Sequence, residues 1–222
     1  MKKLTSLALV AAAVSSSFCF SSVANAEVSL NAGVTTNYVW RGVTQSNNAA
    51  SVSGGLDYSD DSGFYAGTWV GSLGDANSGF NGAETDFYLG YAGESGDFGY
   101  DVGYIYYGYY QEEDIDFGEL YFNGSYGNLG FGVAYTVNGE SGGNFDSGDI
   151  YLHAGYGGID LGNELELGLT VGYYSFDFDS SADYAHVQAD ISKGDFTISF
   201  SKAESTSGNS DLIMMASWGT SF

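Results

Sequence analysis

Hydrophobic and polar side chains alternate along most of the chain, and the alternation is clearest near its start. From residue 28 to residue 40 one parity carries mainly apolar or aromatic side chains, including Val28, Leu30 and Trp40, while the other carries mainly Ser, Asn, Gly and Thr. A repeat of two residues indicates a β-strand with one apolar and one polar face. Such a strand belongs either to a soluble sheet or to a barrel that spans a membrane.

The same alternation, interrupted by clusters of Gly, Asp, Asn and Ser, predicts twelve strands. They cover residues 28–43, 49–59, 63–73, 83–93, 97–110, 116–126, 128–138, 148–157, 164–177, 183–192, 194–204 and 211–222. Nearly all reach the roughly 9–11 residues that a tilted strand needs to cross a bilayer. Ten or fourteen strands stay open, because segment 63–73 has large side chains on both parities and the division near 192–194 is weakly marked.

The connections between these segments alternate as well. Those after odd-numbered segments are long or acidic, such as QEEDI and GESGGNFDSG, and those after even-numbered segments tend to be short. An even strand number, with long loops at one end and both termini at the other, is typical of bacterial outer-membrane barrels. The sequence therefore predicts an all-β, closed, antiparallel, up-and-down transmembrane β-barrel. A soluble β-sandwich is the alternative, because it would show the same alternation.

Composition and the N-terminal segment favour the barrel. Aromatic residues make up 17% of the chain beside 34 Gly and no Pro, and Pro would remove backbone donors from a closed sheet. The basic start, the short apolar run after it and the Ala-Asn-Ala motif at 24–26 predict a secretory signal peptide over 1–26, cleaved on export. The remaining 27–222 is then a single barrel domain, expected in the bacterial outer membrane.

Three stretches carry a resemblance to a known family. TTNYVWRGVTQSNNAASVSGGLDY, GFYAGTWVGSL and ETDFYLGYAGESGDFGYDVGYIYY resemble the TorF-type porins, which are small proteobacterial outer-membrane proteins, and the likeness is sharpest from Thr35 to Tyr110. It implies a barrel and a role in the diffusion of small solutes, without catalytic residues. The last strand ends ASWGTSF, which resembles the signal by which the barrel-assembly machinery recognises its substrates, so Phe222 is predicted to contact that machinery.

If the apolar parity faces lipid, the other parity lines an acidic lumen. The formal net charge is −23, and only Arg41, Lys193 and Lys202 are basic after the predicted signal. Candidate lumen and constriction residues are Arg41, Glu84, Asp86, Asp101, Glu119, Asp149, Glu166 and Asp190. An acidic, water-filled passage concentrates cations and repels anions. The predicted function is therefore a porin-like channel for passive diffusion of small solutes, with a preference for cations.

Arg41 has two interpretations, and both stay open. It pairs with a wall carboxylate such as Glu84 or Asp86 and holds a loop against the wall, which is the favoured interpretation, or it is the cationic half of a transverse field across a constriction. Loop acids such as Asp75, Glu112 and Asp146 are expected to be solvated.

Aromatic side chains fall into two groups. Those of apolar parity near segment ends are predicted to form girdles at the two membrane interfaces, and they include Tyr38, Trp40, Tyr58, Trp218 and Phe222. Twelve strands lie between the roughly eight that give a filled interior and the roughly sixteen that leave a channel, so the lumen's width stays open. Five residues of inward or ambiguous parity are expected to pack inside and narrow it: Tyr65, Trp69, Tyr107, Tyr109 and Tyr151.

Other function classes find less support in the sequence. A non-conducting structural barrel, or one that binds ligands or lipopolysaccharide, is the main alternative. An outer-membrane hydrolase would need Ser and His together, and both histidines, His153 and His186, have inward parity. DIDFGE and DFDSSAD lack the full calcium-loop pattern, and nothing predicts a cofactor, a metal site or a nucleic-acid partner. The expected partners are outer-membrane lipids, lipopolysaccharide, and small solutes or cations.

Overall fold

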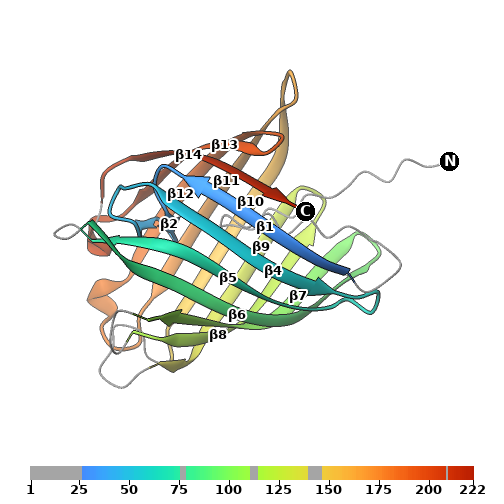
Figure 1. The fold of residues 1–222 in the computed structure, drawn as a ribbon. Helices are drawn as coiled ribbons and strands as arrows, with labels where there is room; N and C mark the ends of the chain where they lie inside the picture. Colours follow the sequence, from blue (N-terminus) through green and yellow to red (C-terminus); the bar gives the residue numbers. More distant parts are fainter. Residues whose placement is uncertain (1–26, 76–78, 111–114, 140–146, 209) are drawn as a thin grey trace.

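The chain forms a closed barrel, as the computed structural model in Figure 1 shows. The structure describes residues 27–75, 79–110, 115–139, 147–208 and 210–222. Within them, twelve antiparallel strands follow one another around the wall in chain order, and the last pairs with the first. The predicted closed antiparallel barrel and its strand number are confirmed. The predicted signal peptide lies outside the described residues.

The wall is made of β1 and β4 to β14. Their bounds are β1 (Glu27–Thr35), β4 (Ser51–Ser59), β5 (Phe64–Asp75), β6 (Gly79–Ser95), β7 (Phe98–Tyr109), β8 (Phe117–Tyr126), β9 (Leu129–Gly139), β10 (Ile150–Gly162), β11 (Leu165–Ser175), β12 (Tyr184–Lys193), β13 (Phe196–Ala203) and β14 (Ile213–Ser221). Four short elements lie outside the wall: β2 (Val39–Trp40), β3 (Val43–Thr44) and the 3₁₀ turns η1 (Ser180–Ala182) and η2 (Ser205–Ser207).

The seam between the first and last strands closes the sheet. Val34 of β1 is the register partner of Trp218 in β14 on one side and of Val52 in β4 on the other. Each wall strand therefore has a hydrogen-bonded neighbour on both sides. A sheet without a free edge satisfies its backbone groups internally, which is the condition for placing strands in hydrocarbon.

The two faces of the wall differ as the alternation predicts. Along β9, Leu129, Phe131 and Val133 are exposed on the outside, whereas Ala134 and Thr136 are buried inside. Exposed apolar side chains recur around the outer face, including Val28, Leu30, Val52, Leu56, Phe87, Leu89, Val102, Leu120, Phe122, Leu152, Leu169, Val171, Val187 and Ile198. A continuous apolar surface of this extent needs a cover that is not water.

Strand β5 settles the segment whose parity is ambiguous in the sequence. Phe64 and Val70 are exposed on the outer face, and Tyr65 and Trp69 are buried inside. Both faces of β5 therefore carry aromatic or apolar side chains. One set covers the outer surface, and the other fills the lumen.

The high content of Gly and Tyr follows from packing across neighbouring strands. Gly67 of β5 lies opposite Tyr88 of β6, and a Cβ at Gly67 would come within 2.6 Å of that ring. The pair formed by Tyr65 and Gly90 repeats this arrangement one step along the same two strands. A glycine thus lets a large inward ring lie flat against the wall, which keeps bulky side chains inside a narrow barrel.

The two ends of the barrel carry different connections. Glu27, where the described chain starts, and Phe222 lie at one end, the terminus end, where the turns between strands are short. The opposite end, the loop end, carries the longer connections. Strand β10 runs to Gly162, so the turn before β11 is only Asn163 and Glu164, with φ of 56° and 65°. This turn is therefore as short as the others at the terminus end. Within the described residues, no helix is both long and apolar enough to span a bilayer.

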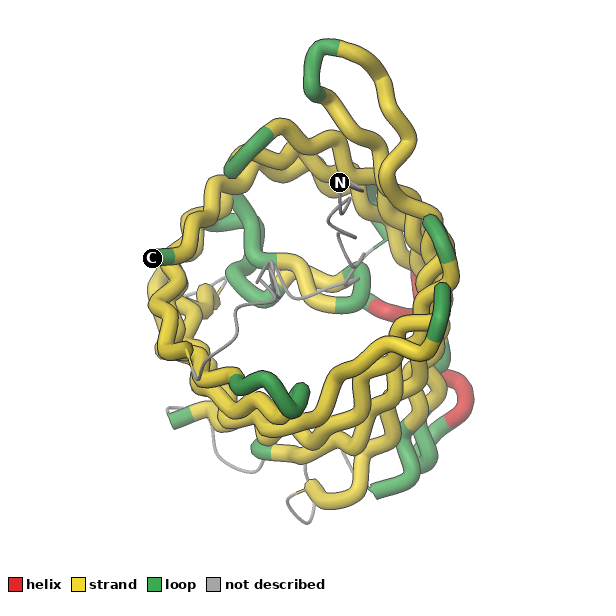
Figure 2. Tube along the Cα trace, turned by 90° about the vertical axis from the view of Figure 1, so that its right-hand side faces the viewer, coloured by secondary structure: helices red, strands yellow, loops and turns green. Residues whose placement is uncertain are grey.

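The first predicted strand, 28–43, is wrong in its second half. Strand β1 ends at Thr35, and residues 36–50, here called the plug, turn into the barrel before β4 begins. Figure 2 looks along the barrel and shows a closed ring of strands with a segment of strand and loop lying across its interior. The alternation continues past Thr35 because the plug contains a hairpin of its own, β2 paired with β3.

Candidate functional site

The plug hairpin turns on two residues. Arg41 and Gly42 join β2 to β3 with φ of 48° and 86°. A two-residue turn with both φ values positive is the type I′ hairpin turn, which matches the right-handed twist of its strands. Glycine adopts this conformation freely, but arginine adopts it only where its other contacts hold it there. The turn therefore presents the Arg41 side chain at the tip of the hairpin.

Hydrogen bonds from polar side chains to the backbone and to one another hold the base of the plug. The Ser46 hydroxyl accepts a hydrogen bond from the Tyr38 backbone N–H at 2.8 Å and donates to the Ala49 carbonyl at 2.6 Å. Asn37 donates to the side chain of Asn48 at 2.9 Å. These bonds tie the two arms of the plug together where they leave the wall.

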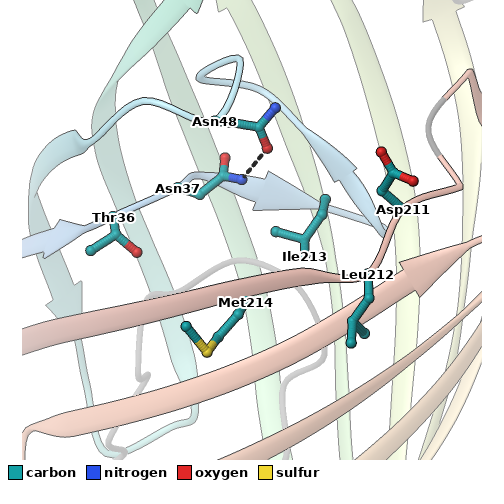
Figure 3. Close-up of a pocket in the computed structure, with 7 residues that line it drawn as sticks. All are labelled: Thr36, Asn37, Asn48, Asp211, Leu212, Ile213 and Met214. Carbon is teal, nitrogen blue, oxygen red and sulfur yellow. Dashed lines mark hydrogen bonds between the residues drawn. The ribbon is translucent and has the colours of Figure 1, made fainter.

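A recess lies beside this base, at the loop end of β14. Figure 3 shows its seven lining residues, with the hydrogen bond between Asn37 and Asn48 above the strand that carries Met214. Its volume is about 460 Å³. The recess marks where the plug and β14 separate at the barrel mouth.

Arg41 is bound to the far wall by an ion pair. Its Nη1 and Nη2 donate to the two carboxylate oxygens of Glu119, in β8, at 2.7 and 2.6 Å. Its Cζ atom lies 4.1 Å from the ring centre of Tyr151 and 4.9 Å from that of Tyr174. Both Arg41 and Glu119 are buried. A two-pronged, charge-assisted bond of this kind fixes orientation as well as charge.

Apolar contacts on both sides of the hairpin complete the closure. Trp40 makes edge contacts with Tyr107 at 5.7 Å and Phe117 at 6.1 Å between ring centres. Val39 packs with Ile213 and Met215 of β14 on the opposite side. The plug therefore reaches across the lumen and blocks its loop end.

Two predicted girdle residues are part of this packing, so that prediction is wrong for them. Tyr38 and Trp40 are buried inside the barrel and do not lie on its outer face. The Tyr38 hydroxyl donates to Glu84 at 3.0 Å, and its ring lies 5.5 Å from that of Trp69. The cause is the early end of β1: beyond Thr35 the parity of the chain no longer reports which side faces outward.

The expected partners of Arg41 are also wrong. Glu84 accepts the hydrogen bond from Tyr38, and Asp86 has one carboxylate oxygen, Oδ1, without a hydrogen-bond partner in the described part of the chain. Arg41 instead reaches Glu119, two strands further around the wall, because the hairpin carries it across the lumen. An ion pair that holds a loop against the wall is nevertheless the arrangement observed.

The other predicted lumen residues differ in burial and in their position along the barrel. Asp149 is buried at the loop end and accepts a hydrogen bond from the Asp177 backbone N–H at 2.8 Å. Asp101 and Asp190 are partly exposed on the inward parity of β7 and β12. Glu166 also has inward parity but is exposed near the terminus end of β11, away from the plug.

A second polar network crosses the lumen nearer the terminus end. The Tyr65 hydroxyl donates to Asp101 at 2.5 Å and is hydrogen-bonded to the hydroxyl of Tyr121. Asp57 accepts hydrogen bonds from Tyr88 and, at 2.8 Å, from Asn31. Tyr88 and Tyr121 are not among the residues predicted from the sequence for the site, although their inward parity is the signal that would have found them.

The remaining predicted girdle residues lie on the outer face. Tyr58, Trp218 and Phe222 sit near the terminus end of β4 and β14, with Tyr58 and Phe222 exposed and Trp218 partly exposed. Their position fits an interface with headgroups, and their role as a girdle stays a prediction.

The candidate catalytic and calcium features have other partners. His186 shares a hydrogen bond with Tyr151 at 2.8 Å, and His153 with Asn123 at 3.2 Å. In the loop between β11 and β12, the Ser181 side chain and backbone N–H lower the pKa of Asp179, which caps η1. The part of the chain that the structure describes contains no group of three or more His, Cys, Asp or Glu side chains arranged to hold a metal ion. The acids at 112–114 and at 146, and the side chain at 75, lie outside the description.

The closed wall, its apolar outer face and the polar groups of its interior define the class of closed, antiparallel, up-and-down β-barrels. Among solved structures the chain is similar to the KdgM porin, with 9% identity and a TM-score of 0.56 over 87% of this chain and 98% of that chain. It is also similar to a KdgM porin in complex with disordered oligogalacturonate, with 9% identity and a TM-score of 0.52 over 88% of this chain and 97% of that chain. At this identity the similarity establishes the fold.

The chain belongs to the family described as "Bacterial protein of unknown function (Gcw_chp)", whose model matches residues 21–209. A comparison with curated proteins gives no match. The family description differs from that of the TorF-type porins, so the resemblance to those porins stays a prediction.

Proposed function

We propose that the protein is an outer-membrane channel for passive diffusion of small polar solutes, closed at its loop end by the plug. The observation that carries the proposal is that the obstruction is a loop. The wall itself encloses a polar interior, and residues 36–50 fill its loop end through one ion pair, a few hydrogen bonds and ring contacts. A lumen filled only by wall side chains would have no element that could move aside.

The charge of the interior supports a preference for cations. Glu84, Asp86 and Glu119 line the loop half of the lumen, and Arg41 is the basic side chain placed among them. Lys193 and Lys202, the other basic residues of the described chain, lie at a turn and on the outer face. Oligogalacturonate, present in one of the KdgM structures, is a polyanion, so a solute for this acidic lumen would differ from it in charge.

Location and export are part of the proposal. An apolar outer face on a barrel without a free edge fits a lipid bilayer, and the signal-like segment at 1–26 fits export. We expect outer-membrane lipids and lipopolysaccharide around the wall, and the barrel-assembly machinery to act on the strand that ends at Phe222.

Planar-bilayer recording of the refolded protein tests the function. We expect discrete current steps, with a reversal potential across a salt gradient that indicates cation preference. A reversal potential of anion sign would overturn the electrostatic argument and leave the channel intact. Permanent absence of steps, even after the plug is removed, would instead favour the second candidate.

The second candidate is a non-conducting structural or ligand-binding barrel. The observation that favours it is the close packing at the loop end, where Phe117, Tyr174 and Glu119 are almost completely buried. In the channel the packed loop end opens, and in the non-conducting barrel it stays closed. The two histidines have wall partners, Tyr151 for His186 and Asn123 for His153.

A further inference from the structure

The partners of the Arg41 guanidinium come mostly from the wall. Glu119, Tyr151 and Tyr174 belong to β8, β10 and β11, three strands of the barrel. Trp40, whose ring lies 4.2 Å from the Arg41 Cζ atom, is the member that the plug itself supplies. A carboxylate and two aromatic rings are therefore arranged around the guanidinium group of a residue from another part of the chain.

Wall contacts that do not involve Arg41 also hold these groups in place. The Tyr151 ring lies nearly parallel to the rings of His153 and His186, with centres 5.6 and 5.8 Å away, and its hydroxyl is hydrogen-bonded to His186. The Tyr107 hydroxyl lies 3.4 Å from Glu119 Oε2. The wall therefore has the means to keep the site in shape when Arg41 leaves, which is the condition for binding another ligand there.

The chemistry of the site matches guanidinium better than ammonium. Two parallel N–H donors meet the two oxygens of one carboxylate, and the flat cation faces aromatic rings. A planar fork satisfies both requirements at once, whereas an ammonium is a compact point charge with strong hydration.

The loop half of the lumen holds further carboxyl groups near Glu119. Asp86 interacts electrostatically with Glu84 and Glu119, and one of its oxygens has no hydrogen-bond partner among the described residues. It is 1% exposed. Glu84, Asp86 and Glu119 thus bring three carboxyl groups together in the half of the lumen that holds the Arg41 guanidinium.

We infer that Glu119, Tyr151 and Tyr174 form a recognition site for solutes that carry a guanidinium group, and that Arg41 is its tethered occupant. A solute that enters the site displaces Arg41 and so releases the tip of the plug. This inference rests on the proposed function, because it names the class of solute that the channel admits. Binding at the wall can nevertheless be measured without any current.

Binding is tested on the full chain in detergent with Arg41→Ala, which empties the site. Methylguanidinium is expected to change Trp fluorescence saturably and to raise the unfolding temperature, and methylammonium, of equal charge, to bind about tenfold more weakly. Lys202→Ala removes one positive charge from the outer face and serves as the matched control. It is expected to respond only at much higher methylguanidinium concentrations, because the ligand must first displace Arg41.

Two further measurements separate the inference from simple charge neutralisation. Adding Glu119→Gln to Arg41→Ala is expected to abolish methylguanidinium binding. In the wild-type protein in bilayers, methylguanidinium is expected to raise the open probability more than methylammonium does, which keeps the inference testable where Arg41→Ala fails to fold. Equal effects of the two cations, or binding that survives Glu119→Gln, would overturn it. A channel that conducts without such binding refutes only this inference, whereas binding without current refutes only the proposed function.

Discussion

The two halves of the lumen are built from the same kinds of side chain but differ in what fills them. In the terminus half, the Asp57 and Asp101 carboxylates accept hydrogen bonds from wall tyrosines and stay partly exposed. In the loop half, Glu84 and Glu119 are 1% exposed, because the plug covers them. Among the described residues, the plug and inward wall rings such as Phe117 and Tyr174 together close the loop half.

The wall and the plug also differ in the interactions that stabilise them. The wall depends on backbone pairing between every neighbouring pair of strands and on its apolar surface, whereas the plug depends on few contacts of which one is ionic. Changes to the plug are therefore expected to alter passage through the barrel before they unfold it.

Removing the plug has the largest expected effect. Thr35 and Ser51 are register partners, so a linker of Gly and Ser can replace residues 37–48 without disturbing β1 or β4. Single-channel conductance in bilayers is expected to rise several-fold, because the described obstruction of the loop half is gone. Replacing Ser205, Thr206 and Ser207 of η2 by Gly-Ser-Gly is the control, and it should leave the conductance unchanged. An unchanged conductance without the plug would mean that the wall side chains close the lumen.

Breaking the buried ion pair comes next. Glu119→Gln leaves the Arg41 charge buried without its partner, and loss of one partner of a buried pair typically costs about 3–5 kcal/mol. Unfolding in urea with detergent measures the free energy of unfolding of the variant. The exposed pair between Lys193 and Glu164, at 3.2 Å, provides the comparison, and Glu164→Gln is expected to have no measurable effect. An equal decrease in the free energy of unfolding for Glu119→Gln and Glu164→Gln would contradict the buried position of Arg41.

A methyl group at the turn of the plug has a smaller expected effect. A Cβ at Gly42 would lie 2.6 Å from the His186 Cβ atom, at a φ of 86°. Gly42→Ala is expected to cost about 1–3 kcal/mol through this clash and to increase the conductance as the tip lifts. Gly194→Ala adds a Cβ to a positive-φ turn with nothing within 4 Å, so it isolates the backbone strain. If both substitutions leave the conductance unchanged, the tip does not seal the lumen.

The sequence predicts the wall well because the alternation that defines each wall strand lies within that strand. Alternation in β9 and β11 continues across the whole strand, and closure requires an even strand number with both termini at one end. The filling of the lumen by inward rings such as Tyr107 and Tyr151 also follows from parity, whereas the direction of Trp69 is ambiguous in the sequence.

The plug could not be predicted in the same way, since its hairpin has the same two-residue period as the strand before it. The signal that was available is the Arg-Gly pair between VW and VT, a possible two-residue turn. The choice of Glu119 over Glu84 as the partner of Arg41 depends on how far the hairpin reaches across the barrel. That distance is a property of the closed wall and is absent from any local pattern.

The smallest expected effect concerns selectivity, and it tests the two halves directly. With the plug in place, Asp101 is partly exposed to the lumen whereas Glu84 is covered, so only the first carboxylate should act on passing ions. Asp101→Asn is expected to lower the ratio of cation to anion permeability by less than about twofold, because other acids remain. Glu84→Gln is expected to leave the ratio unchanged.

Repeating both substitutions in the protein without residues 37–48 reverses the expectation for Glu84. Its carboxylate then loses the hydrogen bond from Tyr38 and lines an open passage, so Glu84→Gln should lower the permeability ratio as much as Asp101→Asn does. Reversal potentials across the same salt gradient measure all four combinations. If Glu84→Gln changes the ratio while the plug is present, ions already pass beside Tyr38, and the loop half is a narrow filter that the plug shapes and does not shut.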